Sequence, residues 1–410
     1  MNDKTKVAKN IFWLLSEHGV RIAGGVVTAS ILARVLGVER YGIFQYILGL
    51  VVIFKSLSYV NSAELMVPKL AIADGAERRC LMGSGFFIRA FFCIAAYIAF
   101  LTFVYFSNDI KVFHLALILG FCILLDEAFS IVTAFLQSQT MIKYRSALYI
   151  CFTIAKVALL ASLFWLGVTN IHIYALTYML ESVCMALGLL LIYKILNKNL
   201  FFAFNFDKTL SLLKEGLPFF VGICFMCVFW RADIVATRYL SDGTSLGLYA
   251  SAAQLFTSVT AMASIIAASF APLFVYKFDE LRIVKKNIWL LACAMSVLAV
   301  FTSAAIYFLS PRLIGLIFGA KFSGAVEIFR YLLFILPLIF LNEALNLYII
   351  KMKLGKLLIY KWGLALGSAV AAYLYFIPLH GAVGTVIGLA AGYLVACIFG
   401  VAAILMINEI

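Results

Sequence analysis

The feature that most constrains this chain is a succession of apolar runs, each long enough to cross a lipid bilayer, separated by short charged or turn-forming connections. A spanning helix needs about 20 apolar residues, and in lipid its backbone hydrogen bonds must be made within the segment. We therefore expect an all-α polytopic membrane protein of about twelve transmembrane helices. The expected spans are residues 11–33, 41–61, 84–106, 112–136, 147–167, 172–193, 217–240, 246–275, 287–309, 324–350, 357–378 and 381–407.

Composition supports this class, because 65% of the 410 residues are hydrophobic and 12% are charged, against roughly 45–50% and 25% in soluble domains. Soluble, disordered and disulfide-built chains are excluded on that ground. Cys224 and Cys227 have CxxC spacing, but they lie in mid-span without neighbouring Cys or His partners. We expect them to pack as small apolar groups. The four histidines have no metal-ligand spacing, and we expect no metal, no other cofactor and no catalytic residue.

The basic residues lie unequally on the two sides of the expected spans. Twenty of the 32 Lys and Arg fall in the N-terminus and alternate connections, and six fall in the opposite set. Because basic connections stay in the cytoplasm, we expect both termini to be cytoplasmic and the first helix to insert without a cleaved signal peptide. Basic residues scattered in twos to fours also account for the net charge of +13 without nucleic-acid binding.

Two positions repeat at half the length of the chain. Arg34 and Arg238 are 204 residues apart, and so are Pro68 and Pro272. With six expected spans per half, this spacing predicts two pseudo-symmetric six-helix bundles, residues 1–205 and 206–410, around a central cavity. Transporters built from parallel repeats bind substrate between the halves and rock one half against the other.

Three segments together resemble a known family. They are Ala33–Phe44 (ARVLGVERYGIF), Arg231–Asp233 followed by Gly247–Leu255 (GLYASAAQL), and Leu313–Arg330 (LIGLIFGAKFSGAVEIFR). The chain resembles the polysaccharide-transport, or O-antigen flippase, family of the multidrug/oligosaccharidyl-lipid/polysaccharide export superfamily. The resemblance covers essentially the whole chain, in order.

The resemblance implies a flippase that moves an undecaprenyl-pyrophosphate-linked oligosaccharide across the bacterial inner membrane by alternating access. It implies a role in O-antigen, lipopolysaccharide or similar surface-polysaccharide biosynthesis, as an antiporter if a proton or cation gradient drives transport. The expected partners are the lipid-linked oligosaccharide, membrane lipids and the polysaccharide polymerase machinery, and we expect a monomer. The resemblance also implies a cationic central cavity.

Three basic residues within the spans are candidates for binding an anionic substrate, because a charge in the bilayer needs a partner or a watery cavity. Arg21 has Glu17 one turn before it, so it is either self-neutralised in an ion pair or part of a cavity wall. Lys55 has no carboxylate three or four residues away; it either snorkels or meets substrate. Arg231 and Asp233 point to different sides of their helix, so Arg231 needs another partner.

Carboxylates and polar residues complete the candidate site. Asp126 and Glu127 are adjacent in one span, which suits either proton or cation coupling or neutralisation of Arg89 and Lys156. Gln254 lies on a polar helix face that either lines the route or allows close packing. We expect Glu327 and Arg330 to form a structural i,i+3 pair, and Gly384, Gly388 and Gly392 to form a helix-packing ridge.

Two alternatives remain open at this point. A cation-coupled exporter of drugs or small amphiphiles, from the same superfamily, would favour carboxylates and aromatics over arginines. A membrane-embedded polysaccharide polymerase, ligase or glycosyltransferase would share the composition. Such enzymes generally expose a catalytic loop or domain, whereas the outer connections here reach about fourteen residues. No GxxxxGK[ST] loop is present, and we expect a transporter rather than an enzyme.

Overall fold

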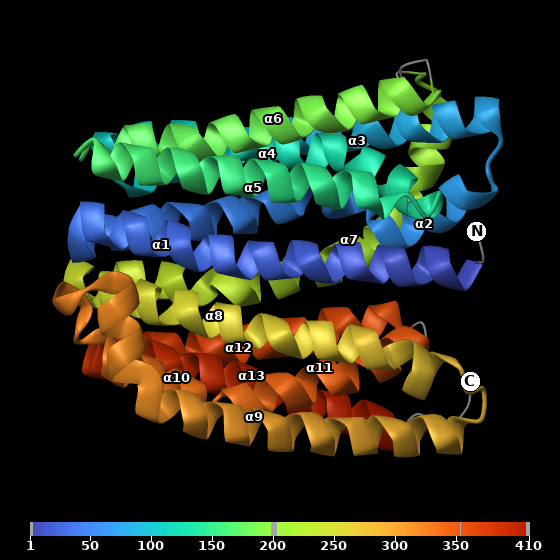
Figure 1. The fold of residues 1–410 in the computed structure, drawn as a ribbon. Helices are drawn as coiled ribbons and strands as arrows, with labels where there is room; N and C mark the ends of the chain where they lie inside the picture. The colour runs from blue at the N-terminus through green and yellow to red at the C-terminus, as the bar shows by residue number, and fades with distance from the viewer. Residues whose placement is uncertain (1–2, 198–202, 353, 407–410) are drawn as a thin grey trace. The chain divides into compact units, whose positions relative to one another are not determined.

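The computed structural model describes residues 3–197, 203–352 and 354–406, and within these ranges it is all-helical (Figure 1). In chain order the helices are α1 (Asp3–Lys55), η1 (Ser56–Asn61), α2 (Ala63–Ile72), α3 (Gly75–Ser107), α4 (Ile110–Ser138), α5 (Ile142–Trp165), α6 (Ile171–Asn197), α7 (Phe206–Leu240), α8 (Gly243–Ala271), η2 (Pro272–Tyr276), α9 (Leu281–Phe318), η3 (Ala320–Phe322), α10 (Ala325–Leu333), α11 (Leu336–Lys351), α12 (Gly355–His380) and α13 (Ala382–Met406).

Ten helical stretches among the described residues are long and apolar enough to cross a membrane, or eleven when α10 and α11, bent by 42°, count as one broken span. The difference from twelve lies at the N-terminus. There, Phe12–Ile72 is one stretch of 61 residues, too long for a single crossing at about 20 residues. It contains two of the expected spans and is interrupted at Gly37, whose φ of 73° is non-helical. The polytopic all-α prediction is confirmed.

The described residues pack into two compact units. Unit 1 contains the chain up to Ile31 together with Leu50–Cys224, and unit 2 contains Leu32–Gly49 together with the chain from Phe225 onward. Helices α1 and α7 therefore each contribute residues to both units. The short segment Leu32–Gly49 of the N-terminal half belongs to unit 2, a membership that the halves 1–205 and 206–410 do not anticipate.

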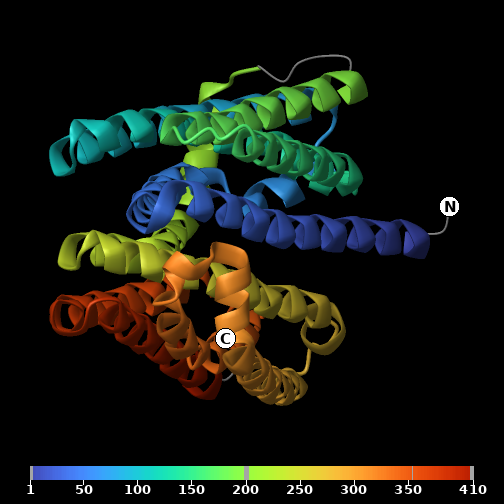
Figure 2. The ribbon, with the colours of Figure 1, turned by 60° about the vertical axis from the view of Figure 1, so that its left-hand side comes forward.

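Unit 1 is built on α3, α4, α5 and α6, which run side by side in both views (Figures 1 and 2). Its core is apolar and aromatic; for example, the rings of Phe135 and Tyr193 lie 5.1 Å apart. An ion pair between Lys69 and Glu215 (Nζ–Oε2 2.7 Å) ties the first turns of α7 to α2. The hydrogen bond that Lys69 donates lowers the pKa of Glu215.

Unit 2 contains the segment Leu32–Gly49 as a buried element. Its Tyr41, Phe44 and Tyr46 are fully buried. Arg34 donates hydrogen bonds to the carbonyl oxygens of Leu316 and Ile317, which lie in the last turn of α9 and lack helical partners. The segment thus contributes core side chains and caps a helix.

Glycines allow the closest helix contacts in unit 2. A Cβ on Gly384 would lie 2.2 Å from the carbonyl oxygen of Phe376, and one on Gly388 would lie 2.1 Å from the ring of Tyr373. A Cβ on Gly392 would meet the ring of Phe229 at 2.3 Å. These distances are inside van der Waals contact, so α13 packs on its neighbours through these glycines. The predicted packing ridge is confirmed.

Candidate functional site

A polar cavity of about 400 Å³ lies within unit 1. Its walls come from α1, η1, α4, α5 and α6. Polar space among membrane-spanning helices is the place where charged side chains can be hydrated or meet a ligand. The charged residues that line the cavity are Arg21, Lys55, Asp126, Glu127, Arg145 and Glu181.

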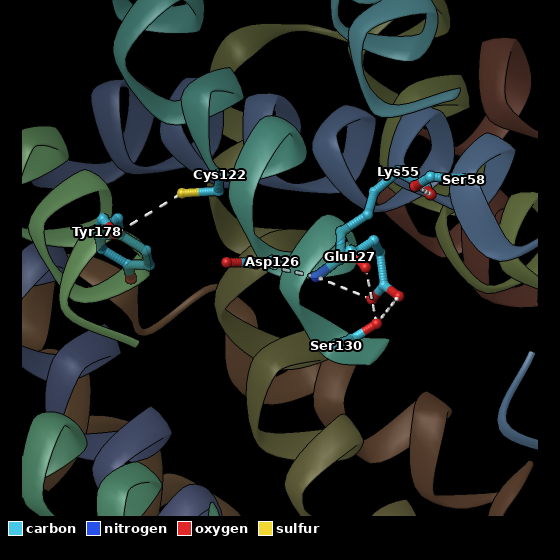
Figure 3. Close-up of polar contacts among 7 residues, drawn as sticks. All are labelled: Lys55, Ser58, Cys122, Asp126, Glu127, Ser130 and Tyr178. Atoms are coloured by element: carbon cyan, nitrogen blue, oxygen red, sulfur yellow. Dashed lines mark hydrogen bonds and ion pairs between the residues drawn. The ribbon is translucent and has the colours of Figure 1, made fainter. Parts of the chain in front are cut away.

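Lys55 is the centre of the first ion-pair cluster (Figure 3). It lies in the last turn of α1, where a cation is favoured by the helix dipole. Its Nζ is 2.9 Å from Oδ2 of Asp126 and 3.7 Å from Oε1 of Glu127, and Ser130 Oγ donates to Glu127 Oε2 at 2.9 Å. Lys55 therefore points to two adjacent carboxylates of α4.

Glu17 is the centre of the second cluster. Its carboxylate is 1% exposed and accepts hydrogen bonds from three groups on two helices. Arg21 Nη2 lies 3.0 Å from Oε1, Arg145 Nη1 lies 2.9 Å from the same oxygen, and Ser146 Oγ donates to Oε2 at 2.8 Å. The side chain of Arg21 is 44% exposed, and its guanidinium lies 4.7 Å from the ring centroid of Tyr149. Both interpretations of Arg21 therefore hold, because it is paired and it lines the cavity.

A third pair joins Lys156 of α5 to Glu181 of α6, with Nζ 2.7 Å from Oε2. Lys156 is thus paired with Glu181, while Arg89 donates hydrogen bonds to Ser130 and to the carbonyl of Asn61. Asp126 and Glu127 have Lys55 as their cationic neighbour, a pairing that the sequence does not predict. Of the charged residues that line the cavity, three are basic and three are acidic. The wall of this cavity within unit 1 is therefore balanced in charge.

Arg145 is a site residue that the sequence does not indicate. It falls in a basic connection, among the residues expected to orient the protein in the membrane. In the structure it lies in the first turn of α5 and reaches Glu17, 128 positions earlier in the chain. No local pattern in the sequence signals a pair so far apart.

The other predicted site residues belong to unit 2. Asp233 is buried and accepts hydrogen bonds from Tyr249 Oη at 2.6 Å and from the backbone of Ile234. Arg231 and Gln254 are half-buried, on α7 and α8. The structure groups Glu17, Arg21, Lys55, Asp126 and Glu127 within unit 1, and it places Arg231, Asp233 and Gln254 outside that cavity. In the described ranges no cluster of three or more His, Cys, Asp or Glu is placed to hold a metal ion.

Solved structures with this arrangement of helices are transporters. The lipid II flippase MurJ, in an inward closed conformation, superimposes with a TM-score of 0.74 at 13% identity, covering 97% of this chain and 87% of that one. An inward-facing multidrug resistance MATE family transporter of the MOP superfamily gives 0.72 at 14% identity, covering 95% and 94%. A MOP superfamily transporter from Pyrococcus furiosus gives 0.59 at 13% identity, covering 99% and 96%. This chain shares its fold with these three transporters.

The model of the family described as polysaccharide biosynthesis protein matches residues 7–276. The chain therefore belongs to that family, and it is a multi-pass membrane protein with the fold of MOP superfamily transporters. The predicted family and fold class are confirmed. A comparison with curated protein sequences gave no match.

Proposed function

We propose that this protein is an alternating-access flippase for an undecaprenyl-pyrophosphate-linked oligosaccharide, such as an O-antigen repeat unit. Family membership supports polysaccharide biosynthesis, and the fold supports transport. The observation that carries the substrate class is the pair of guanidinium groups, Arg21 and Arg145, beside a single carboxylate at the cavity. Two cations against one anion leave one positive charge for the substrate.

The chemistry of a pyrophosphate fits these arginines. A guanidinium presents a planar fork of N–H donors that matches two phosphate oxygens. Glu17 accepts from one edge of each arginine and fixes both side chains, while the exposed part of Arg21 stays open to the cavity. Arg231 in unit 2 is proposed as a further contact for the anion and Gln254 for the sugar. These two assignments rest on residue type and helix position.

The proposed setting is the bacterial inner membrane with both termini in the cytoplasm. The protein would act as a monomer that delivers substrate to the polymerase machinery.

Removal of the gene tests this function. In a host that makes a surface polymer, deletion should abolish the long polysaccharide while lipid-linked repeat units accumulate on the cytoplasmic leaflet. Complementation with Arg21→Ala, Arg145→Ala or the double variant should restore progressively less polymer, with equal protein in the membrane. Lys143→Ala, a basic residue of the same region outside the cavity lining, serves as the control. Full export by the double variant would contradict the cavity assignment.

Asp126 and Glu127 are proposed to couple transport to a proton or cation. They share one ammonium group, Lys55, so the cluster carries one excess negative charge when both are ionised, and binding of one cation neutralises it. Asp126→Asn and Glu127→Gln should each change the dependence of transport on pH or sodium, measured in vesicles with an imposed gradient. Glu215→Gln, an exposed carboxylate outside the cavity, should leave that dependence unchanged. If neither cavity variant alters it, this coupling role is wrong.

A second candidate function is a cation-coupled exporter of drugs or small amphiphiles. The three carboxylates of the cavity wall, Asp126, Glu127 and Glu181, are the observation that favours it. Accumulation of a cationic dye in cells with and without the gene separates the two candidates. A flippase leaves dye accumulation unchanged and alters surface polymer, whereas an exporter does the reverse.

A further inference from the structure

A second cavity, of about 330 Å³, lies within unit 2 between α9 and the bent pair α10–α11. Its lining is almost entirely apolar, with Phe308 and Phe334 at 79% and 71% exposure. The cavity is therefore an open groove with an apolar wall, and its one charged lining residue is Arg330.

Prolines fix the shape of this groove. Pro311 has no N–H, so the carbonyl of Tyr307, four residues earlier in α9, loses its helical donor. Ser310 Oγ donates to that carbonyl at 2.7 Å, and Arg330 Nε donates to Ser310 Oγ at 3.0 Å. In the same way Pro337 removes the donor for the carbonyl of Leu333, which accepts from Ser303 Oγ of α9 at 2.8 Å. These cross-links hold α9 and α10–α11 at a fixed spacing.

The same bonds leave part of Arg330 unused. Its Nε donates to α9, and its guanidinium lies 4.6 Å from the ring centroid of Tyr307. The expected ion pair with Glu327 is absent: among the described residues, no carboxylate lies within ion-pair distance of Arg330, and its two Nη groups make no hydrogen bond. An arginine held in place by its Nε, with no carboxylate partner and with its Nη donors beside an apolar groove, suits an anion.

We propose that this groove binds an anionic phospholipid. Its phosphate accepts hydrogen bonds from Nη1 and Nη2 of Arg330, and one acyl chain lies along Val300, Ala304 and Phe308. The positive charge of Arg330 selects a lipid with an anionic headgroup, and the apolar lining of the groove accommodates the acyl chain. The ligand is an amphiphile already present around the protein, and this site is independent of the flippase proposal because it lies in a different unit from the polar cavity.

The test measures which lipids stay bound to the purified protein. The full chain, in nanodiscs of equimolar phosphatidylglycerol and phosphatidylcholine with identical acyl chains, is released into a mass spectrometer. Wild-type protein should retain phosphatidylglycerol over phosphatidylcholine, and Arg330→Gln should reduce that ratio by about fivefold, the factor for one basic residue at a lipid surface. Arg312→Gln, at an exposed arginine of α9 outside the groove lining, is the matched control with the same change of charge.

A second pair of variants keeps the proposal testable if Arg330→Gln fails to fold. Ala304→Phe fills the groove without touching Arg330, whereas Ala305→Phe places the same ring outside the lining. Ala304→Phe should lower retention of phosphatidylglycerol, and Ala305→Phe should not. Equal retention by Arg330→Gln and Arg312→Gln, or by the two alanine variants, overturns the proposal. Displacement of phosphatidylglycerol by an equal concentration of inorganic phosphate would also overturn the proposal. In that case the acyl chain would contribute nothing to the binding free energy.

Discussion

At the scale of single residues, the ionisable side chains that line the cavity of unit 1 form ion pairs. A pair can be predicted from the sequence when both partners lie one turn apart on the same helix. Glu17 and Arg21 are one turn apart and could be paired from the sequence. The partners Lys55 and Asp126 are 71 positions apart, and their contact depends on how α1 packs on α4. The sequence identifies the charged residues whose burial in a bilayer costs free energy. Tertiary packing decides which residue of opposite charge lies beside each of them.

Glu17 should contribute more to stability than either arginine. Glu17→Gln leaves Arg21 and Arg145 side by side without their shared carboxylate, and removes charged hydrogen bonds that each contribute about 1.5–3 kcal/mol. Arg21→Ala leaves Glu17 paired with Arg145 and Ser146, and should cost less than about 1 kcal/mol because Arg21 is half-exposed. Thermal unfolding of the two variants in detergent shows which substitution lowers stability more. A larger loss for Arg21→Ala than for Glu17→Gln would contradict this account.

At the scale of elements, both the helices and the break between the first two expected spans were predictable. The runs 11–33 and 41–61 are expected as two spans, and Gly37, whose φ is 73°, separates two helical stretches within α1. Glycine adopts a positive φ without the strain that a side chain adds, so the local sequence marks this break. The break between α10 and α11 was predictable as a kink, because Pro337 cannot donate a hydrogen bond to Leu333.

Glycine substitutions in α13 should test the packing of unit 2. Gly388→Ala places a methyl group within 2.1 Å of the fully buried ring of Tyr373, and overpacking of this kind costs about 1–3 kcal/mol. Gly367→Ala, on α12 with no atom within 4 Å of its Cβ, should be neutral or stabilising because alanine favours helix. Melting temperatures of the two purified variants give the comparison. Equal losses would show that close approach at Gly388 is not needed.

At the scale of the whole molecule, the repeat spacing suggests two halves, whereas packing assigns Leu32–Gly49 to unit 2. The spacing of 204 residues indicates which segments of the two halves correspond to each other. It does not indicate in which compact unit each segment packs. Gly42 and Gly247 illustrate the difference. They are corresponding positions in the two halves, and a Cβ on Gly42 would lie 2.8 Å from the backbone nitrogen of Gly247.

The C-terminal half should therefore not fold alone. Residues 206–410 lack Tyr41, Phe44 and Tyr46, which are fully buried in unit 2, and loss of such aromatics costs about 3–5 kcal/mol each when their space is left empty. Expressed without residues 1–205, this half should aggregate or be degraded. Co-expression of the two halves should restore a monodisperse complex by size-exclusion chromatography. A monodisperse C-terminal half on its own would contradict the assignment of Leu32–Gly49 to unit 2.

Because Leu32–Gly49 packs in unit 2, the parts of that unit are synthesised at widely separated times. Tyr41 packs near Phe318 and Phe322, which the ribosome adds about 280 residues later. At about 5–20 residues per second, this is a delay of about 14–56 s. During that interval the nascent chain has an inserted segment whose partners do not yet exist. Unit 2 therefore cannot be completed before translation has passed Phe322.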